Sequence, residues 1–413
     1  MDFSPDRIRA WWYRLQNSLW FLPALITAIS ILLAFASLNV DRRFQLQDGP
    51  VSMLVFSGGV EGARGVLSAI AGTMMTVTAL VFSITIVALQ VAASQLTPRA
   101  LRSIMADRGN QVVLGFFVAT FTYALIVLRA VRSPLEDRSQ FVPGLSVAVA
   151  IGLALISVAL LIFFMHHSAN ALRTSVVIGR IFDETRGLID SLYPDDVGEP
   201  AHDLPARPGM PYIVSADDPG YLQAIDADTL FALAERQRLT IDLAPTIGTF
   251  ILPRSQIASV WSDGALSDDI ASKIRGALSL GSERTMQSDV DFGLQQLADI
   301  GLRALSPGVN DPTTAVVVVD HLAALVIQLA NRGQPETVRE GDDEAVRLIL
   351  RAPSFNALVA TAFEQISHYG ADNPTFARHL TSTLEHAAAL VPPSSRPQLL
   401  RFAEPVGAQA GER

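Results

Sequence analysis

Residues Gly65–Ser94 read GVLSAIAGTMMTVTALVFSITIVALQVAAS, an apolar stretch without a single charged residue. At about 1.5 Å rise per residue, a helix of this length can cross a hydrocarbon core of about 30 Å. Small and hydroxyl-bearing residues recur along the stretch at helical spacing. They predict one small, polar helix face, which consists of Ser68, Gly72, Thr76, Ala79, Ser83, Ile86 and Gln90.

This face has two interpretations, because polar groups that face lipid are costly. Small residues let two helices approach closely, so the face can pack against a neighbouring helix. Alternatively, several copies of the chain bring this helix together and line a permeation path. Threonine and serine hydroxyls can then replace part of the hydration shell of an ion.

The composition favours a membrane domain followed by a soluble domain. Half of the 413 residues are hydrophobic, the mean hydropathy is +0.34, and the apolar excess lies before about residue 167. Cysteine is absent, which excludes disulfides and thiolate chemistry. The net charge of −9 argues against a nucleic-acid partner.

The hydropathy pattern predicts four membrane-spanning helices, at about 18–38, 66–92, 112–131 and 142–165, after an N-terminal segment at 1–17. An even number of spans places both termini on the same side of the membrane. The arginines that flank the spans favour the cytoplasm for that side.

The remainder of the chain is expected to form a soluble α+β domain. We expect an amphipathic helix and linker at 168–207, and a small β-barrel or sandwich at 208–262. A helical bundle then extends over 263–405, with one helix at about 342–350 and a buried apolar helix at about 315–329. The tail at 406–413 is predicted to be disordered.

Two segments resemble a bacterial family of predicted integral membrane proteins that is catalogued as a domain of unknown function. They are VFSITIVALQVAASQLTPRALRSIMADRGNQVVLGFFVATFTY at 81–123 and GSERTMQSDVDFGLQQLADIGLRALSPGVNDPTTAVVVVDHL at 281–322. The most specific part is LSPGVNDPTTA at 305–315. The resemblance implies a multi-pass protein of the bacterial inner membrane, and it implies no activity.

The second of these segments contains a charged group before one helix and a polar corner after it. Carboxylates close in sequence can bind a divalent cation or another ligand. More often, such residues complement a helix dipole or build a rigid turn. The candidate residues are Glu283, Arg284, Asp289, Asp291, Ser306, Asn310, Asp311 and Thr313.

The motifs of common enzymes are missing from the sequence, including nucleotide-binding loops, the nucleophile elbow and zinc-hydrolase signatures. We therefore expect no enzymatic activity, no cofactor and no metal site. The leading hypothesis is an oligomeric ion channel in contact with the lipid bilayer, with inorganic ions and further copies of the chain as partners. The alternative is a membrane-anchored sensor or scaffold, and a transporter is a third possibility.

Overall fold

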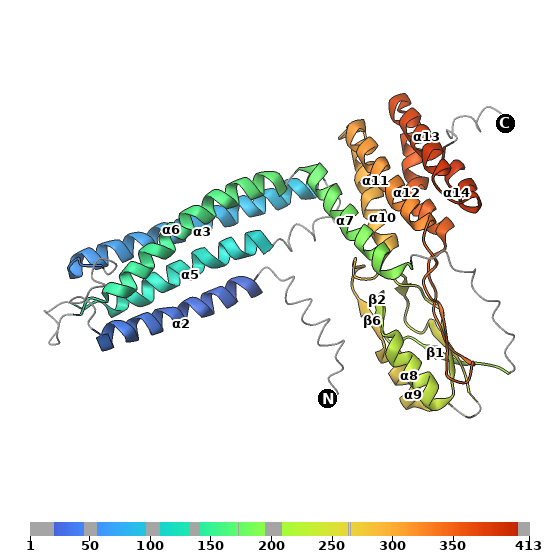
Figure 1. The fold of residues 1–413 in the computed structure, drawn as a ribbon, viewed down its shortest axis with the longest axis horizontal. Coiled ribbons are helices and arrows are strands. Elements are labelled where there is room, and N and C mark those ends of the chain that lie inside the picture. Colours follow the sequence, from blue (N-terminus) through green and yellow to red (C-terminus); the bar gives the residue numbers. More distant parts are fainter. Residues whose placement is uncertain are drawn as a thin grey trace. The chain divides into compact units, whose positions relative to one another are not determined.

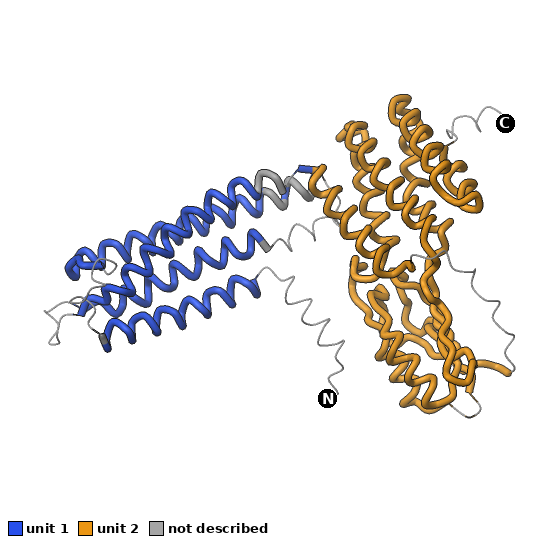
Figure 2. Tube along the Cα trace, in the orientation of Figure 1, with its two compact units in different colours: residues 1–173 blue, residues 174–413 orange. Residues whose placement is uncertain are grey.

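A computed structural model describes residues 20–44, 56–95, 108–132, 141–171, 173–194, 209–262, 264 and 266–403. The chain divides into two compact units, Met1–Arg173 (unit 1) and Thr174–Arg413 (unit 2), coloured separately in Figure 2. The predicted segments 1–17 and 406–413, and most of the linker before residue 208, lie outside the described residues.

Unit 1 consists of long apolar helices (Figure 1). They correspond to the four apolar stretches of the sequence, although their bounds differ from the predicted ones by up to six residues. They are α2 (Phe21–Phe44), α3 (Val60–Gln95), α5 (Arg108–Ala130) and α6 (Gly144–Ala171).

Helix α5 lies at the centre of unit 1 and contacts α2, α3 and α6. Gly115 of α5 permits the close approach of α2, because a Cβ atom there would lie 2.8 Å from the Cα atom of Pro23. Tyr123 and Phe117 are fully buried between the helices.

Helix α2 extends six residues beyond the predicted end at 38. The reason is Asp41, which is only 6% exposed. Its carboxylate accepts hydrogen bonds from the backbone amides of Leu145 and Ser146, each at 2.9 Å. The first amides of a helix have no partner within that helix, so Asp41 of α2 caps α6. This contact stabilises the helical conformation of α2 as far as Asp41.

Unit 2 begins with the amphipathic helix α7 (Thr174–Leu192), within the range predicted for it. The apolar face of α7 packs against α10 and α11. The further helices are α8 (Ala227–Gln237), α9 (Asp268–Gly276), α10 (Val290–Leu305), α11 (Pro312–Ala330), α12 (Phe355–Gly370), α13 (Pro374–Ala389), the 3-10 helix η3 (Pro393–Ser395) and α14 (Arg396–Leu400).

Two sheets lie beside this bundle in unit 2. The first has the order β1-β5-β3-β8-β7 and the second the order β4-β2-β6. All neighbouring strands are antiparallel except β3 and β8, which are parallel. The strands are β1 (Tyr212–Ser215), β2 (Gly220–Ile225), β3 (Thr240–Leu243), β4 (Phe250–Ile251), β5 (Gln256–Trp261), β6 (Leu278–Gly281), β7 (Val338–Glu340) and β8 (Val346–Ile349).

The sheets differ from the prediction in one respect. The region after residue 262 is not purely helical, because it supplies β6, β7 and β8. The helix expected at about 342–350 is instead the turn and second strand of a hairpin. Its turn contains Glu344 at φ +60°, a left-handed conformation that ends regular helix, and Leu348 and Ile349 bury their side chains in the sheet.

Five described helices are long and apolar enough to cross a membrane, namely the four of unit 1 and α11 of unit 2. Helix α11 packs against α7, α10, α12 and α13. Its polar residues bind neighbours in unit 2: the Oδ1 atom of Asp320 lies 2.7 Å from Nε2 of His379, and Gln328 donates to Asp190.

Candidate functional site

The small, polar face of α3 is exposed along its whole length in the single chain. Ser68, Gly72, Thr76, Ala79, Ser83, Ile86 and Gln90 are all exposed. At 100° per residue, these seven positions cover only about 80° of the helix circumference. The buried residues Leu67, Met74 and Val81 lie on the opposite side and face the other helices.

In the described part of the single chain this face is exposed rather than packed against a neighbouring helix, so helix packing and a permeation path both stay predictions about contacts between copies. A Cβ atom added at Gly72 would meet no atom within 4 Å, so Gly72 makes no close helix contact. The Thr76 hydroxyl donates to the Gly72 carbonyl at 3.0 Å and therefore satisfies its donor within α3. Its oxygen retains lone pairs on an exposed face.

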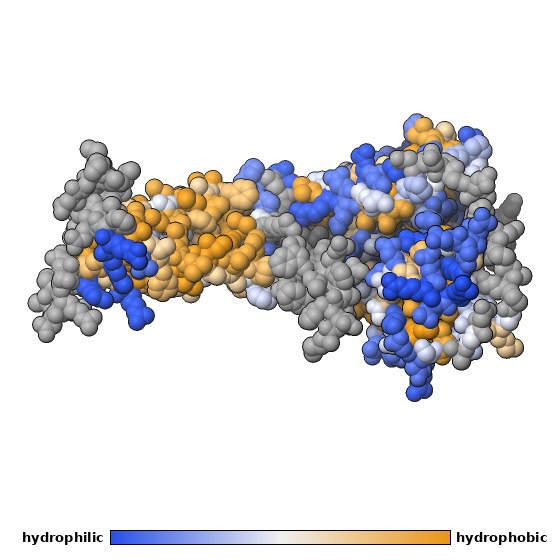
Figure 3. Space-filling view, turned by 60° about the horizontal axis from the view of Figure 1, so that its bottom comes forward, coloured by the Kyte–Doolittle hydropathy of each residue, from blue (hydrophilic) through white to orange (hydrophobic). Residues whose placement is uncertain are grey.

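The outer surface of α6 is a plain apolar surface with which the α3 face can be compared. Leu155, Ile162 and Met165 are between 63% and 68% exposed, and all three are large and apolar. Figure 3 shows that the surface of unit 1 is hydrophobic over most of its described length. Small and hydroxyl residues therefore distinguish the α3 face from this lipid-like surface.

The charged residues before α10 form a tight cluster around one guanidinium. The Nε and Nη2 atoms of Arg284 donate to the two carboxylate oxygens of Asp289, each at 2.8 Å. Arg284 also donates to Asp291 at 2.9 Å and to Gln295 at 3.0 Å. Thr361 of α12 donates to the other oxygen of Asp291 at 2.6 Å. The cluster therefore joins the segment after β6 to α10 and α12.

Local backbone structure supports the cluster from two sides. Asp289 is the N-cap of α10 and accepts from the amide of Phe292 at 3.0 Å. Gly248, at φ +87°, passes so close that a Cβ atom would lie 2.7 Å from Nη2 of Arg284. Glu283 is different: its side chain is exposed, and its carbonyl accepts from Gln223 of β2 at 2.7 Å.

Burial is the main cause of the pKa shifts of Asp289 and Tyr193. Burial raises the pKa of the Asp289 carboxyl, and the guanidinium of Arg284 opposes this rise. Burial, together with the charges of Asp291 and Asp289, raises the pKa of Tyr193 to about 12. Tyr193 is thus a neutral phenol beside the cluster at neutral pH.

The polar corner between α10 and α11 is built from hydrogen bonds within the corner itself. The carbonyl of Ser306 accepts from the amide of Asn310 at 2.9 Å, and Asn310 adopts φ +48°. Asp311 is the N-cap of α11, and its carboxylate accepts from the amide and the hydroxyl of Thr314 at 3.1 and 2.6 Å. The hydrogen bond from the Thr314 hydroxyl lowers the pKa of Asp311. The side chain of Thr313 is exposed.

These arrangements favour the structural interpretation of the two polar segments over cation binding. The carboxylates of the cluster surround an arginine, and Asp311 caps a helix. The described residues include no group of three or more histidines and carboxylates that could hold a metal ion.

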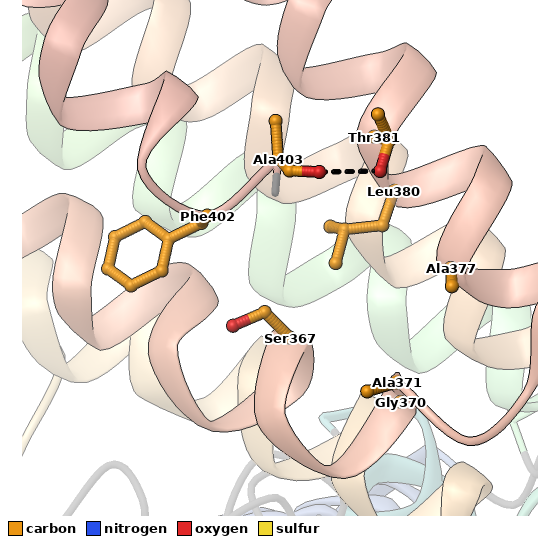
Figure 4. A pocket seen from close by; sticks show the side chains of 8 residues that line it. All are labelled: Ser367, Gly370, Ala371, Ala377, Leu380, Thr381, Phe402 and Ala403. Carbon is orange, nitrogen blue, oxygen red and sulfur yellow. Dashed lines mark hydrogen bonds between the residues drawn. The ribbon is translucent and has the colours of Figure 1, made fainter. Parts of the chain in front are cut away.

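A small cavity between α12, α13 and Phe402 is shown in Figure 4. Ser367, Leu380 and Thr381 line it, and Thr381 donates to the carbonyl of Ala403 at 2.7 Å. Its volume of about 10 Å³ suits roughly one water molecule. The cavity is therefore too small for an organic substrate.

Sequence reasoning missed several members of these sites. Thr361 and Gly248 join the Arg284 cluster from segments far along the chain, and no local pattern connects them. Asp41 carried a usable signal, because it is an acidic residue at the end of an apolar run and can cap another helix there.

The fold and these sites define an integral membrane protein with apolar helices and a C-terminal unit of mixed sheets and helices. Residues 16–386 match the family model "Predicted membrane protein (DUF2254)", and the chain belongs to this family. The chain is similar to an uncharacterized protein of Mycobacterium bovis and to one of Mycobacterium tuberculosis. Each is 35% identical over 390 residues, which is 92% of this chain and 74% of the relative. No solved structure matches the chain.

Proposed function

We propose that this protein forms a homo-oligomer in the bacterial inner membrane and that the exposed face of α3 lines an ion path between the copies. In this proposal the four helices of unit 1 cross the bilayer, α11 remains in the soluble unit, and both termini are cytoplasmic. Unit 2 assembles the copies or gates the path. The proposal assigns no enzymatic activity and no cofactor.

One observation carries the proposal: the seven residues of the small, polar α3 face are exposed in the part of the chain that the structure describes. Polar side chains that face lipid are costly, so a face of this kind gains stability by meeting another copy or water. The hydroxyl oxygens of Thr76 and Ser83 can accept a partly dehydrated cation. The absence of charged residues within Gly65–Ser94 favours a passive path over a proton-coupled pump.

The first test is the oligomeric state of the full chain in detergent, measured by light scattering. The proposal expects a single oligomer, and a monomer would exclude the path between copies. The second test is ion flux into proteoliposomes. Ser83→Leu is expected to reduce the flux on the order of tenfold, because an apolar constriction dewets a pore, and Thr76→Val is expected to reduce it less.

Thr85→Val is the matched control for both variants. Thr85 lies about 180° from Thr76 around α3, is half-buried, and donates to Val81 within the helix at 2.9 Å. Its replacement is expected to leave the flux unchanged. An oligomer whose flux survives both Ser83→Leu and Thr76→Val would instead support the alternative function, in which unit 1 is an anchor for a sensor or scaffold.

A further inference from the structure

Three exposed arginines lie at one end of unit 1, where α2 and α5 end. Arg42 and Arg43 are in the last turn of α2, and Arg129 is in the last turn of α5. Figure 3 shows a hydrophilic end on the hydrophobic surface of unit 1. These residues have no role in the proposed ion path.

The contacts between α2 and α5 place the arginines at the same end of unit 1. The two helices run in the same direction, since Pro23 lies beside Gly115 and Ser37 beside Tyr123. The Ser37 and Tyr123 hydroxyls are 2.8 Å apart. Arg43 and Arg129 each lie six residues beyond this contact, or about 9 Å further along their helices.

Two acidic residues near this end, among those that the structure describes, have other partners. The Asp41 carboxylate is buried and accepts from Ser146 Oγ at 2.6 Å as well as from the first amides of α6. Glu61 lies 4.0 Å from Arg64 instead. In the part of the chain that the structure describes, Arg42, Arg43 and Arg129 form no ion pair.

Exposed apolar side chains lie directly along the helices from each arginine. Phe35 precedes Arg42 by seven residues, Leu32 precedes Arg43 by eleven, and Leu125 precedes Arg129 by four. Each spacing is close to a whole number of turns, so each pair shares a helix face. The three apolar side chains are 56%, 70% and 42% exposed, respectively.

This pattern matches one chemical class of ligand, an amphiphile with an anionic head and an apolar tail. We propose that Arg42, Arg43 and Arg129 bind the phosphate groups of anionic phospholipids, whose acyl chains lie along Phe35, Leu32 and Leu125. Guanidinium groups bind phosphate with two parallel hydrogen bonds. Clusters of basic residues at a membrane boundary attract anionic lipids.

The test is a lipid competition on the detergent-purified full chain. The protein is given equal amounts of phosphatidylglycerol and phosphatidylcholine, and bound lipids are counted by native mass spectrometry. We expect more phosphatidylglycerol than phosphatidylcholine on the wild type. Each arginine removed is expected to weaken phosphatidylglycerol retention by roughly fivefold, so the triple variant Arg42→Gln, Arg43→Gln, Arg129→Gln loses the preference.

The control removes the same charge from unit 2, with Arg236→Gln, Arg378→Gln and Arg396→Gln at exposed positions. It is expected to retain the wild-type preference. A further arm adds inorganic phosphate, which is expected to leave the bound lipid in place because it lacks the apolar tail. If the triple variant fails to fold, the single variants Arg42→Gln and Arg129→Gln replace it. Equal retention of both lipids by the wild type, or an unchanged preference in the arginine variants, overturns the proposal.

Discussion

The α3 face of unit 1 and the Arg284 cluster of unit 2 place polar residues in opposite environments. Every polar position of the α3 face is exposed. In the cluster, by contrast, the Asp289 side chain is 3% exposed and the Arg284 side chain 17% exposed. Both groups looked like candidate binding sites in the sequence.

The polar residues of the Arg284 cluster already have hydrogen-bonding partners. Those of the α3 face still require partners. Arg284 makes four hydrogen bonds to Asp289, Asp291 and Gln295, so its charge is compensated within unit 2. Among the described residues, the α3 face has the hydrogen bond from Thr76 to Gly72 within α3 itself, and a bilayer cannot hydrogen-bond to this face. Changes in the cluster should therefore affect the stability of unit 2, whereas changes in the α3 face should affect assembly.

The largest expected effect is that of Arg284→Met. The variant leaves the buried Asp289 carboxylate without its counter-ion, which costs about 3–5 kcal/mol when one partner of a buried pair is removed. Urea unfolding of unit 2 in the full chain, followed by circular dichroism, measures this loss. Adding Asp289→Asn to the variant removes the stranded charge and is expected to recover part of the stability.

Arg378→Met is the control for this prediction, because Arg378 is an exposed surface arginine of α13. It is expected to change the free energy of unfolding by less than about 0.5 kcal/mol. If Arg284→Met cost no more than Arg378→Met, the cluster would not hold β6, α10 and α12 together, and the comparison with the α3 face would fail.

A pair of glycines tests the same comparison at a smaller scale. Gly248→Ala introduces a Cβ atom against Arg284 at a backbone angle of φ +87°, and is expected to destabilise unit 2 by about 1–3 kcal/mol. Gly72→Ala meets no atom within 4 Å and improves helix propensity, so it should not destabilise the monomer. Thermal unfolding and light scattering measure both variants.

Gly209→Ala separates the two causes of the Gly248 effect, because Gly209 has φ +92° but open space around it. It should show the backbone cost alone. If the Gly248 variant is no less stable than the Gly209 variant, close packing against Arg284 does not contribute to the destabilisation. A Gly72 variant that weakens the oligomer would sharpen the assignment of the α3 face to contact between copies.

The sequence predicted those parts of the fold that depend on local patterns. The apolar stretches predicted the helices of unit 1, and the apolar helix expected at about 315–329 corresponds to α11 (Pro312–Ala330). The β7–β8 hairpin was missed because β8 also pairs outside the hairpin: it lies parallel to the distant strand β3, with Leu348 opposite Ile241. Such pairing leaves no periodic signal near residue 348.

The sites show the same limit. The spacing of Ser68, Gly72, Thr76 and Ser83 was sufficient to define one helix face, since 3.6 residues per turn is a local property. Whether that face was buried depended on which side of α3 contacts α5 and α6, and the sequence does not encode this in any short pattern. The Arg284 cluster likewise includes Gly248 and Thr361, which lie far from residue 284 along the chain.

The smallest expected effect concerns Asp311, which is neither buried like Asp289 nor unpartnered like the α3 face. Asp311→Ala removes the N-cap of α11 and is expected to cost about 1 kcal/mol at pH 7.

The hydrogen bond from Thr314 lowers the pKa of Asp311 in the folded protein below its ordinary value of 3.8. A carboxyl with a lowered pKa contributes its stability above the ordinary pKa and loses it as the pH falls through the lowered value. The difference between wild type and Asp311→Ala should therefore be constant from pH 7 to about pH 5 and shrink below pH 4, measured by urea unfolding at each pH. A difference that persists unchanged at pH 3 would show that the cap does not depend on the charge of Asp311. The corner would then resemble a neutral turn and differ from the charged cluster of Arg284.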